Sequence, residues 1–406
     1  MLKLSDPALW IAVGLLIVIG LLAIVSCTYS MQVKLGGDPF YYLKHQIFSL
    51  FIGIIGLVFF AYLDYKHLKS GSIFLYLLMV ALLGIVMLYG ATAQGAQRWF
   101  QLGPYSFQPS EIAKIIMVIT LAAFFSGKKK IGSLNVFSLF LIVGIPFFLI
   151  FTQPDLGTSL VLVAIFVGML AAAWSPSRVT FLVVTPLLSV LLRANTNLYI
   201  WIGYIAAVAI ILYFWKASFW EWVLILGLNI VAGLAMPYVW GMLKEYQRQR
   251  ILTFLNPASD PKGAGYHSLQ SLIAVGSGGV FGKGFMQGSQ TQLQFIPEQH
   301  SDFVFSVVAE EFGFMGAILV LSLFGIVIWR ALAIASSGGD SFASLLALGI
   351  AVMTGFHIFA NIGMTLGLLP VVGMPLPFMS YGGSSLVTNM ILVGLLLNVR
   401  YRWQEY

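Results

Sequence analysis

Uninterrupted apolar stretches recur along the chain, and polar residues gather between them. Most of these stretches run for about 17–23 residues, enough to cross the hydrocarbon core of a bilayer as a helix. They lack the alternation of apolar and polar positions that is typical of outer-membrane barrel strands. The pattern therefore predicts an all-α, polytopic membrane protein with about twelve transmembrane helices. The predicted segments lie near residues 8–30, 46–63, 73–91, 109–126, 135–151, 156–174, 179–193, 198–215, 219–240, 302–330, 343–369 and 381–399.

The composition agrees with a membrane protein and excludes several other classes. Of the 406 residues, 60% are hydrophobic and only 9% are charged, whereas soluble proteins carry about 25% charged residues. So few charges would not keep a soluble globule of this size in solution, and a disordered chain or a collagen-like fibre is excluded as well. The single cysteine, Cys27, excludes an internal disulfide. The first apolar segment is too long for a signal-peptide core, so we expect it to remain as a helix.

The distribution of Lys and Arg predicts the orientation, because short cytoplasmic loops are rich in these residues. An even number of helices places both termini on one side. With the termini in the cytoplasm, eleven Lys and Arg lie in inner loops and four in outer ones, so the net charge of +7 reflects topology rather than nucleic-acid binding. The inner set is Lys3, Lys66, Lys69, Lys128, Lys129, Lys130, Arg178, Lys216, Arg330, Arg400 and Arg402, and the outer set is Lys34, Lys44, Arg98 and Arg193.

Residues 241–301 form the one large hydrophilic block, and this orientation places it on the extracytoplasmic side. The block contains turn signals such as Asn256-Pro257 and Asp260-Pro261. A moderately apolar stretch, 266–275, predicts a short interfacial helix. A loop of this length between membrane helices is usually functional. We therefore interpret 1–406 as a single integral membrane domain that carries 241–301 as its large outer loop.

Glu111 and Lys114 are both ionisable and lie in an apolar segment that opens at Pro109. Their i, i+3 spacing places them on one helical face, and ionisable residues at membrane depth are costly unless they pair or face a polar cavity. Two interpretations stay open: a structural ion pair, or the wall of a cavity that handles a charged substrate. Arg98, beside an aromatic residue in a nearby loop, suits a phosphate group but equally fits an interfacial anchor. Asp155 is expected to cap the helix that follows it.

The densest group of ionisable residues is Glu298, His300 and Asp302, at the outer mouth of a predicted membrane helix. A carboxylate there serves as a helix cap or as a general base that removes a proton from a hydroxyl, and the density of the group favours the functional interpretation. Glu298 and His300 offer metal or phosphate contacts, although their spacing is not diagnostic of a metal site. Further along the same segment, at least one of Glu310 and Glu311 is expected to face the bundle interior.

Cations in the large outer loop are candidates for binding a pyrophosphate. Arg248 and Arg250 carry guanidinium forks that match phosphate oxygens, and Lys283 lies in a glycine-rich run whose backbone could form an anion nest. Interfacial anchoring is the alternative for the two arginines. The run lacks the GxxxxGK[ST] pattern, and we expect no nucleotide cofactor.

The last outer segment, 369–385, carries three prolines and ends in small polar residues that include Ser380. Irregular backbone at membrane depth is tolerated only where protein buries it or where it lines a wet cavity. We therefore predict that this segment forms a second part of the site and that Ser380 contacts substrate.

Six stretches, spread from Gln108 to Ser385, resemble the SEDS family (shape, elongation, division and sporulation), and in particular its rod-shape branch rather than its division branch. They are QPSEIAK; QPDLGTSL; YQRQRI with NPASDPKGAGYHSLQS; GSGGVFGKG; IPEQHSDFVFSVVAEEFG; and NIGMTLGLLPVVGMPLPFMSYGGSS. Members of this family usually have ten membrane helices, whereas residues 175–240 predict three helices here in place of one. Parity is preserved, so the expected active face stays outside.

The resemblance implies a peptidoglycan glycosyltransferase of the bacterial cytoplasmic membrane that polymerises lipid II during elongation. The acid of its catalytic motif corresponds to Asp302, and its polar helix pair to Glu111 and Lys114. It also implies a class B penicillin-binding protein, a transpeptidase, and other elongation-complex membrane proteins as partners. A divalent cation, Mg²⁺ or Mn²⁺, is the candidate cofactor.

Two other functions stay open. A transporter, in particular a lipid II flippase, fits the intramembrane Glu111 and Lys114 and the proline-broken segments. A non-catalytic scaffold for cell-wall enzymes would leave the group around Asp302 without a role. The ionisable residues gather on the outer face rather than along a two-sided path, which favours the enzyme.

Overall fold

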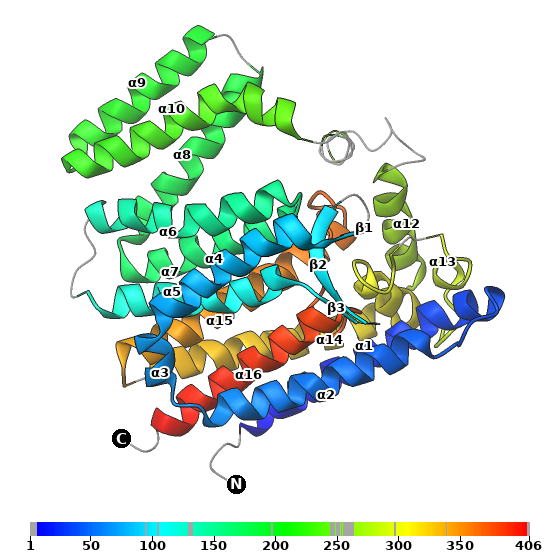
Figure 1. Ribbon diagram of the computed structural model, residues 1–406. Coiled ribbons are helices and arrows are strands. Elements are labelled where there is room, and N and C mark those ends of the chain that lie inside the picture. Colours follow the sequence, from blue (N-terminus) through cyan, green and yellow to red (C-terminus); the bar gives the residue numbers. More distant parts are fainter. Residues whose placement is uncertain are drawn as a thin grey trace.

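The computed structural model describes residues 6–93, 96–103, 105–128, 133–195, 198–243, 248, 252, 254, 264–295, 298–337 and 339–403. Each of the twelve predicted segments corresponds to a helix (Figure 1). Eleven of these helices are long and apolar enough to cross a membrane, and α9 is an apolar helix of 17 residues. The helices are α1 (Pro7–Lys34), α2 (Tyr41–Tyr62), α4 (Ser72–Tyr89), α5 (Pro109–Ser126), α6 (Ser133–Thr152), α7 (Leu156–Ala173), α8 (Pro176–Asn195), α9 (Leu198–Phe214), α10 (Phe219–Met242), α14 (Val304–Ser337), α15 (Ser341–Thr365) and α16 (Gly383–Trp403).

Three helices form the centre of the bundle. Most of α5, α15 and α16 is buried, whereas α2, α4, α8 and α10 leave most of their apolar surface exposed on the outside of the molecule. Apolar burial does not drive association between helices in lipid, so polar contacts and close packing matter more there. Asn398 of α16 illustrates this, because its Nδ2 donates a hydrogen bond to the carbonyl oxygen of Phe60 in α2 at 2.8 Å.

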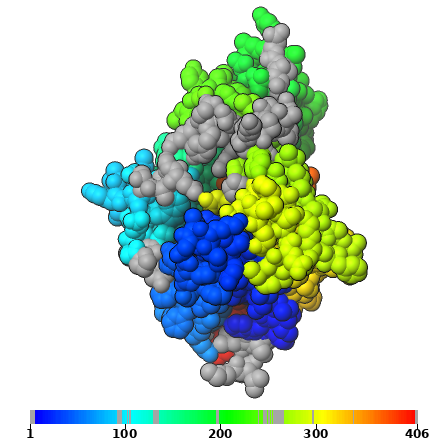
Figure 2. Space-filling model, turned by 90° about the vertical axis from the view of Figure 1, so that its right-hand side faces the viewer, coloured from blue at the N-terminus to red at the C-terminus, as the bar shows by residue number. Residues whose placement is uncertain are grey.

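The two ends of the bundle differ in structure. Both termini lie at one end, together with the short helix α3 (Tyr65–Ser70), and the strands lie at the other end with α12 (Ala264–Ser277) and α13 (Ser289–Gln292) (Figure 1). The predicted helix at 266–275 is therefore confirmed as α12. Viewed from that end, the tips of α1 and α2 lie beside the α12–α13 region (Figure 2).

The segment around Arg98, which we interpreted as a loop, is a small antiparallel sheet. It consists of β1 (Ala91–Ala93), β2 (Ala96–Leu102) and β3 (Tyr105–Phe107) in the order β1-β2-β3. Phe100 pairs with Phe107 across β2 and β3. Short strands of this kind are difficult to recognise from periodicity alone. Arg98 lies in β2, beside the irregularity in its pairing with β1.

Helix α14 is interrupted at Gly313, where φ is 65° and ψ is −160°. The glycine-rich run that precedes α13 packs against this break: Lys283 N donates to the Glu310 carbonyl at 3.0 Å, and Phe314 N donates to the Gly279 carbonyl at 2.9 Å. A Cβ atom at Gly313 would lie 2.3 Å from Gly282 N, so only glycine fits. The backbone N–H groups of Gly282, Lys283 and Gly284 all donate to carbonyl oxygens of the protein, so these three do not form the anion nest suggested for this run.

Helices α8, α9 and α10 stand in place of the single helix that the family pattern leads us to expect. They lie at one edge of the molecule (Figure 1) and contact the rest through α6 and α7. A buried polar network joins them: Asn229 Nδ2 donates to Thr185 Oγ1 at 2.9 Å, and Trp201 Nε1 donates to Ser189 Oγ at 2.8 Å. The three helices therefore form a unit with its own polar interior.

Candidate functional site

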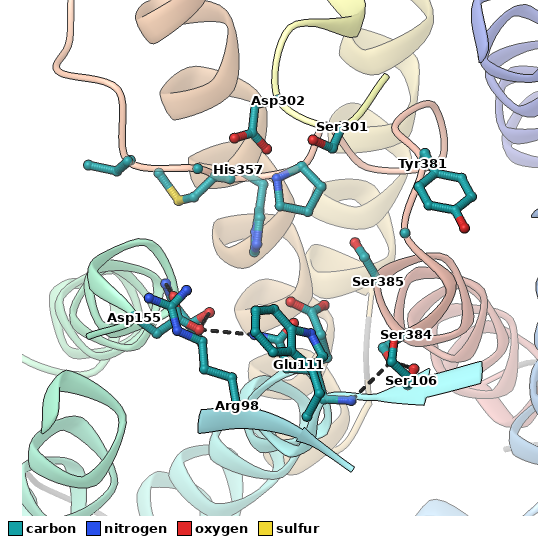
Figure 3. A pocket seen from close by; sticks show the side chains of 18 of the residues that line it. Arg98, Ser106, Glu111, Asp155, Ser301, Asp302, His357, Tyr381, Ser384 and Ser385 are labelled. Carbon is teal, nitrogen blue, oxygen red and sulfur yellow. Dashed lines mark hydrogen bonds between the residues drawn. The ribbon is translucent and has the colours of Figure 1, made fainter. Parts of the chain in front are cut away.

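A cavity of about 520 Å³ opens at the end of the bundle that carries the strands (Figure 3). Its lining comes from segments that are far apart in the sequence but meet around the buried helices α5 and α15. The lining residues with polar or ionisable side chains are Arg98, Trp99, Ser106, Gln108, Glu111, Lys114, Asp155, Thr158, Glu298, Ser301, Asp302, His357, Tyr381, Ser384 and Ser385.

Glu111 and Lys114 form the floor of the cavity. The Lys114 ammonium donates a hydrogen bond to Glu111 Oε1 at 2.8 Å, and both side chains are almost completely buried. Lys114 Nζ also lies 3.1 Å from Nε2 of His357. The predicted i, i+3 ion pair is confirmed, and it lines the cavity at the same time. The two interpretations of the pair are therefore compatible.

Asp302 lies at the rim, in the turn that precedes α14, and its carboxylate points into the cavity (Figure 3). Its backbone is fixed from both sides: Asp302 N donates to the Glu298 carbonyl at 3.0 Å, and Asn361 Nδ2 of α15 donates to the Asp302 carbonyl at 2.9 Å. Gly373, with φ of 70°, brings the opposite wall so close that a Cβ atom there would lie 3.4 Å from Asp302 Oδ2. The fold thus fixes the backbone that carries this carboxylate.

Arg98 is positioned by the turn between α6 and α7. Its Nε donates to the Gln153 carbonyl at 2.8 Å, and Nη2 donates to the Pro154 carbonyl. Asp155 in the same turn caps α7 as predicted, because it accepts from Thr158 N at 3.1 Å. It also accepts from Gln108 Nε2 at 3.0 Å. The turn therefore joins a cation and a carboxylate to the start of α5.

The first turn of α16 supplies two serines to the wall, but not the serine that was predicted. Ser384 and Ser385 line the cavity, and Ser384 Oγ accepts from Gln108 N at 3.1 Å. Ser380 is buried outside the lining, where its Oγ accepts from Leu376 N at 2.8 Å and its carbonyl accepts from Gln46 Nε2 at 3.0 Å. Ser380 therefore holds an irregular turn, and a substrate contact is not what its position supports.

Two other predicted residues, Lys283 and Arg248, lie away from the lining. Lys283 donates to Glu310 Oε1 at 2.9 Å and to Ser289 Oγ at 2.7 Å. Arg248 donates to the carbonyls of Trp240 and Gly241 at 2.7 and 2.6 Å. In each case the cation binds partners of the protein itself, so the structure does not bring it to the cavity. Arg250 lies outside the described residues.

His300 also faces protein rather than the cavity. Its ring lies 4.8 Å from that of Tyr42 and 5.4 Å from that of Tyr381 between ring centroids. Burial lowers the pKa of His300, and Glu298 opposes this effect, with 3.8 Å between His300 Nε2 and Glu298 Oε2. Burial also raises the pKa of Tyr381 to about 12. The aromatic group is therefore neutral near pH 7, and it supports the turn that carries Asp302.

The charges of the lining are unequal in number. Four carboxylates, Glu111, Asp155, Glu298 and Asp302, face two permanent cations, Arg98 and Lys114. In the described part of the chain, no three His, Cys, Asp or Glu side chains converge as a ready metal cage. An anionic substrate would therefore bind at the two cations, and a cation that it brings along would meet Glu298 and Asp302 at the rim.

The sequence analysis missed His357, Asn361 and the two cavity serines. The signal for the first two was present, since a histidine and an asparagine stand four residues apart in a stretch that is otherwise apolar. Polar residues at i, i+4 lie on one helical face, and such a face inside a bundle is costly unless it binds something.

Comparison with known proteins gives a consistent result. The family model of the FtsW, RodA and SpoVE cell cycle proteins matches residues 7–200 and 177–405. The peptidoglycan glycosyltransferase MrdB of Escherichia coli is 34% identical over 97% of this chain and 93% of its own. The peptidoglycan glycosyltransferase RodA of Treponema pallidum is 34% identical over 89% and 90%. Among solved structures, a chain of a peptidoglycan synthase complex that coordinates polymerization and crosslinking matches with a TM-score of 0.73 and 28% identity, covering 99% of both chains.

Proposed function

Because this chain belongs to the FtsW/RodA/SpoVE family and is a multi-pass membrane peptidoglycan glycosyltransferase, we propose that it polymerises lipid II into glycan strands during cell elongation. The observation that carries this proposal is the carboxylate of Asp302, which points into a cavity whose floor and wall hold Lys114 and Arg98. A base and two cations facing one space match a reaction that removes a proton and releases an anion.

In the proposed reaction, the carboxylate of Asp302 takes the proton from the 4-hydroxyl of the acceptor sugar. The oxygen then forms a bond to the anomeric carbon of the donor sugar. The bond from that carbon to the pyrophosphate oxygen breaks, and its electron pair leaves with undecaprenyl pyrophosphate. A single displacement of this kind inverts the anomeric centre. It requires one base and no protein nucleophile, which agrees with the side chains around Asp302.

Lys114 and Arg98 would stabilise the leaving pyrophosphate, because both cations line the cavity that would hold it. The excess of carboxylates in the lining supports a divalent cation, Mg²⁺ or Mn²⁺, entering with the pyrophosphate, and Glu298 and Asp302 are the residues that would hold it. When bound, such an ion would offset pyrophosphate charge. We propose no nucleotide cofactor, since the activated sugar carries its own leaving group.

A second hollow of about 300 Å³ adjoins the cavity and shares Ser106, Tyr381 and Ser384 with it. Ile52, Ile112 and Val387 contribute apolar side chains to its wall. A polyprenyl chain needs an apolar surface next to the site that holds its pyrophosphate. This arrangement supports a lipid-linked substrate over a soluble sugar nucleotide.

The orientation follows from the same proposal. Lipid-linked disaccharide is polymerised outside the cytoplasmic membrane, so the cavity end would face outward and both termini inward, as the Lys and Arg distribution favours. The similarity to a chain of a peptidoglycan synthase complex supports a crosslinking transpeptidase, a class B penicillin-binding protein, as a partner. Other membrane proteins of the elongation complex would assemble with the pair.

The test is polymerisation of purified lipid II by the full-length protein in lipid nanodiscs, with and without Mg²⁺ or Mn²⁺. We expect β-linked glycan chains from an α-linked donor, and release of undecaprenyl pyrophosphate in step with chain growth. In proteoliposomes, transfer of lipid II across the bilayer without chain growth would contradict the proposal and favour a flippase.

A further inference from the structure

His357 of α15 is a buried histidine that lines the cavity but has no role in the proposed reaction. Only 5% of its surface is exposed. One ring nitrogen, Nδ1, lies 2.9 Å from the carbonyl oxygen of Met353, and the other, Nε2, lies 3.1 Å from the Lys114 ammonium. The ring points from α15 toward the floor of the cavity (Figure 3). Both of its nitrogens are therefore engaged.

The two partners determine the protonation of the ring. A carbonyl oxygen only accepts hydrogen bonds, so Nδ1 carries a proton and donates to Met353. A lysine ammonium only donates, so Nε2 offers its lone pair to Lys114. A doubly protonated ring would direct an N–H group at the ammonium, with a positive charge on each side. His357 is therefore a neutral acceptor in a defined tautomer.

This neutral acceptor fixes Lys114 without cancelling its charge. A lysine ammonium has three N–H groups. Glu111 accepts one and His357 accepts another, and in the described part of the chain no partner accepts the third. Glu111 already balances the charge of Lys114, so a second carboxylate at position 357 would leave the pair negative and repel an anion. A neutral acceptor orients the ammonium and leaves one donor for a ligand.

The same face of α15 also holds the turn of Asp302. Asn361 lies four residues after His357, one helical turn further toward the cavity mouth. Its Nδ2 donates to the carbonyls of Asp302 and Met374, at 2.9 and 2.6 Å. One helix thus sets the separation between the Lys114 ammonium and the Asp302 turn. Pre-organised charges of this kind are effective because they need no rearrangement when the ligand arrives.

We propose that His357 is a positioning residue, which directs the Lys114 ammonium at the pyrophosphate of a polyprenyl-linked substrate. This inference rests on the proposed function, because it takes the pyrophosphate as the ligand of the cavity. His357 itself acts through Lys114 and does not touch the reacting atoms.

The test is a double-mutant cycle on affinity for undecaprenyl pyrophosphate, measured with the full-length protein in nanodiscs. Loss of one hydrogen bond to a charged group predicts that His357→Leu weakens binding about tenfold. Lys114→Met removes the ammonium and weakens binding by at least that factor. Because His357 acts through Lys114, the double variant is expected to bind like Lys114→Met alone. Simple additivity of the two losses would overturn the proposal.

Two further variants keep the result interpretable. His357→Gln retains an acceptor oxygen and is expected to bind within about threefold of the unaltered protein, whereas a packing role would leave it as weak as His357→Leu. If melting curves show that His357→Leu does not fold, His357→Met provides the apolar side chain for the same cycle. Unaltered affinity in the apolar variant contradicts the positioning role.

The polymerase activity and the positioning role of His357 can be tested independently. Asp302→Asn is expected to bind undecaprenyl pyrophosphate while losing polymerisation. If the unaltered protein binds the pyrophosphate and the cycle is non-additive, but no polymer forms from lipid II, the proposed reaction fails and the positioning role of His357 stands. If polymer forms and the cycle is additive, the proposed reaction stands and the positioning role of His357 fails.

Discussion

Two groups of charged side chains lie at opposite ends of the molecule and are built differently. At the end that carries the termini, Asp6 is 1% exposed and binds two guanidinium groups, that of Arg330 at 2.8 Å and that of Arg400. It also caps α1 by accepting from Leu9 N at 3.3 Å. At the other end, Lys114, Arg98 and Asp302 face a hollow of about 520 Å³.

The difference shows how a chain with few charges uses them. The carboxylate of Asp6 joins α1, α14 and α16, and its partners enclose it. Around the cavity, the partners hold the backbone or one side of each charged group and leave another side toward the open space. Buried charges that satisfy one another are mainly structural, whereas charges oriented toward a cavity are available to a ligand. Substitutions at the two ends should therefore affect different properties.

We expect the two ends to differ most when one arginine at each end is replaced. Arg98→Gln removes a cavity cation and its contacts with the α6–α7 turn, and we expect polymerisation to fall about 100-fold with little change in melting temperature. Arg330→Gln is the matched control, expected to lower the melting temperature while the folded protein polymerises within about threefold of normal. Normal polymerisation by Arg98→Gln would contradict the distinction between a structural end and a ligand-binding end.

Gly373 tests how closely the cavity wall controls Asp302. Alanine there must adopt a positive φ and places its Cβ 3.4 Å from Asp302 Oδ2, so we expect polymerisation to fall about tenfold. Gly36 is the matched control, because its φ is 69° and a Cβ atom there would meet nothing within 4 Å. Gly36→Ala carries the same backbone cost of about 1 kcal/mol. Equal activity losses in both variants would show that backbone strain alone is responsible.

Asp6→Asn is expected to act on stability alone. Burial by itself would raise the pKa of Asp6, but hydrogen bonds from Arg330, Leu9 N and Arg400 outweigh it and hold the pKa below its usual value. The ionised Asp6 carboxylate therefore stabilises the folded protein above the ordinary carboxyl pKa, and this stabilisation is lost as pH falls through the lowered pKa of Asp6. We expect a loss of about 2 kcal/mol near pH 7, reduced from the fully buried case because the arginines reach solvent.

Thermal unfolding in detergent checks the Asp6 prediction, with Asp38→Asn as its control. Asp38 pairs with Lys44 on the exposed surface, where an ion pair contributes little. If Asp6→Asn melted like the Asp38 variant but polymerised slowly, the assignment of the two ends would be reversed.

His300 provides the smallest expected effect. Burial against Tyr42 and Tyr381 lowers its pKa, with Glu298 opposing. His300 therefore binds a proton more readily in the unfolded chain than in the folded one. The neutral ring contributes its full stabilisation of the fold above the ordinary histidine pKa, and this contribution is lost as pH falls below that value. We expect polymerisation to decline by about threefold or less between about pH 7.5 and 5.5. His300→Phe is expected to flatten that decline, and an unchanged pH profile would exclude this titration as its cause.

The sequence predicted the helices well because apolar length is a local property. All twelve segments are helices, and the Glu111–Lys114 pair follows from spacing within one helix. The helix cap at Asp155 was likewise predicted from the residues next to it in the sequence. The strands around Arg98 were missed because they are short and their pairing depends on a turn rather than on periodicity.

The predicted site was only partly correct, for a different reason. Whether a cation faces the cavity depends on partners that are remote in sequence. Lys283 is occupied by Glu310, 27 residues further along the chain, and Lys114 meets His357 243 residues away. Ser380 and Ser384 belong to one motif, yet the turn buries the first and exposes the second to the cavity. No pattern in a single sequence reports such pairings.

Asp302 is the proposed general base of the cavity, and the most direct test of this role is the polymerisation rate of Asp302→Asn with purified lipid II. The amide has nearly the same shape but cannot take the proton. We predict a rate about 1,000-fold below that of the unaltered protein or lower, with normal melting temperature and normal binding of lipid II. An Asp302→Asn protein that polymerises lipid II at the normal rate would contradict the account.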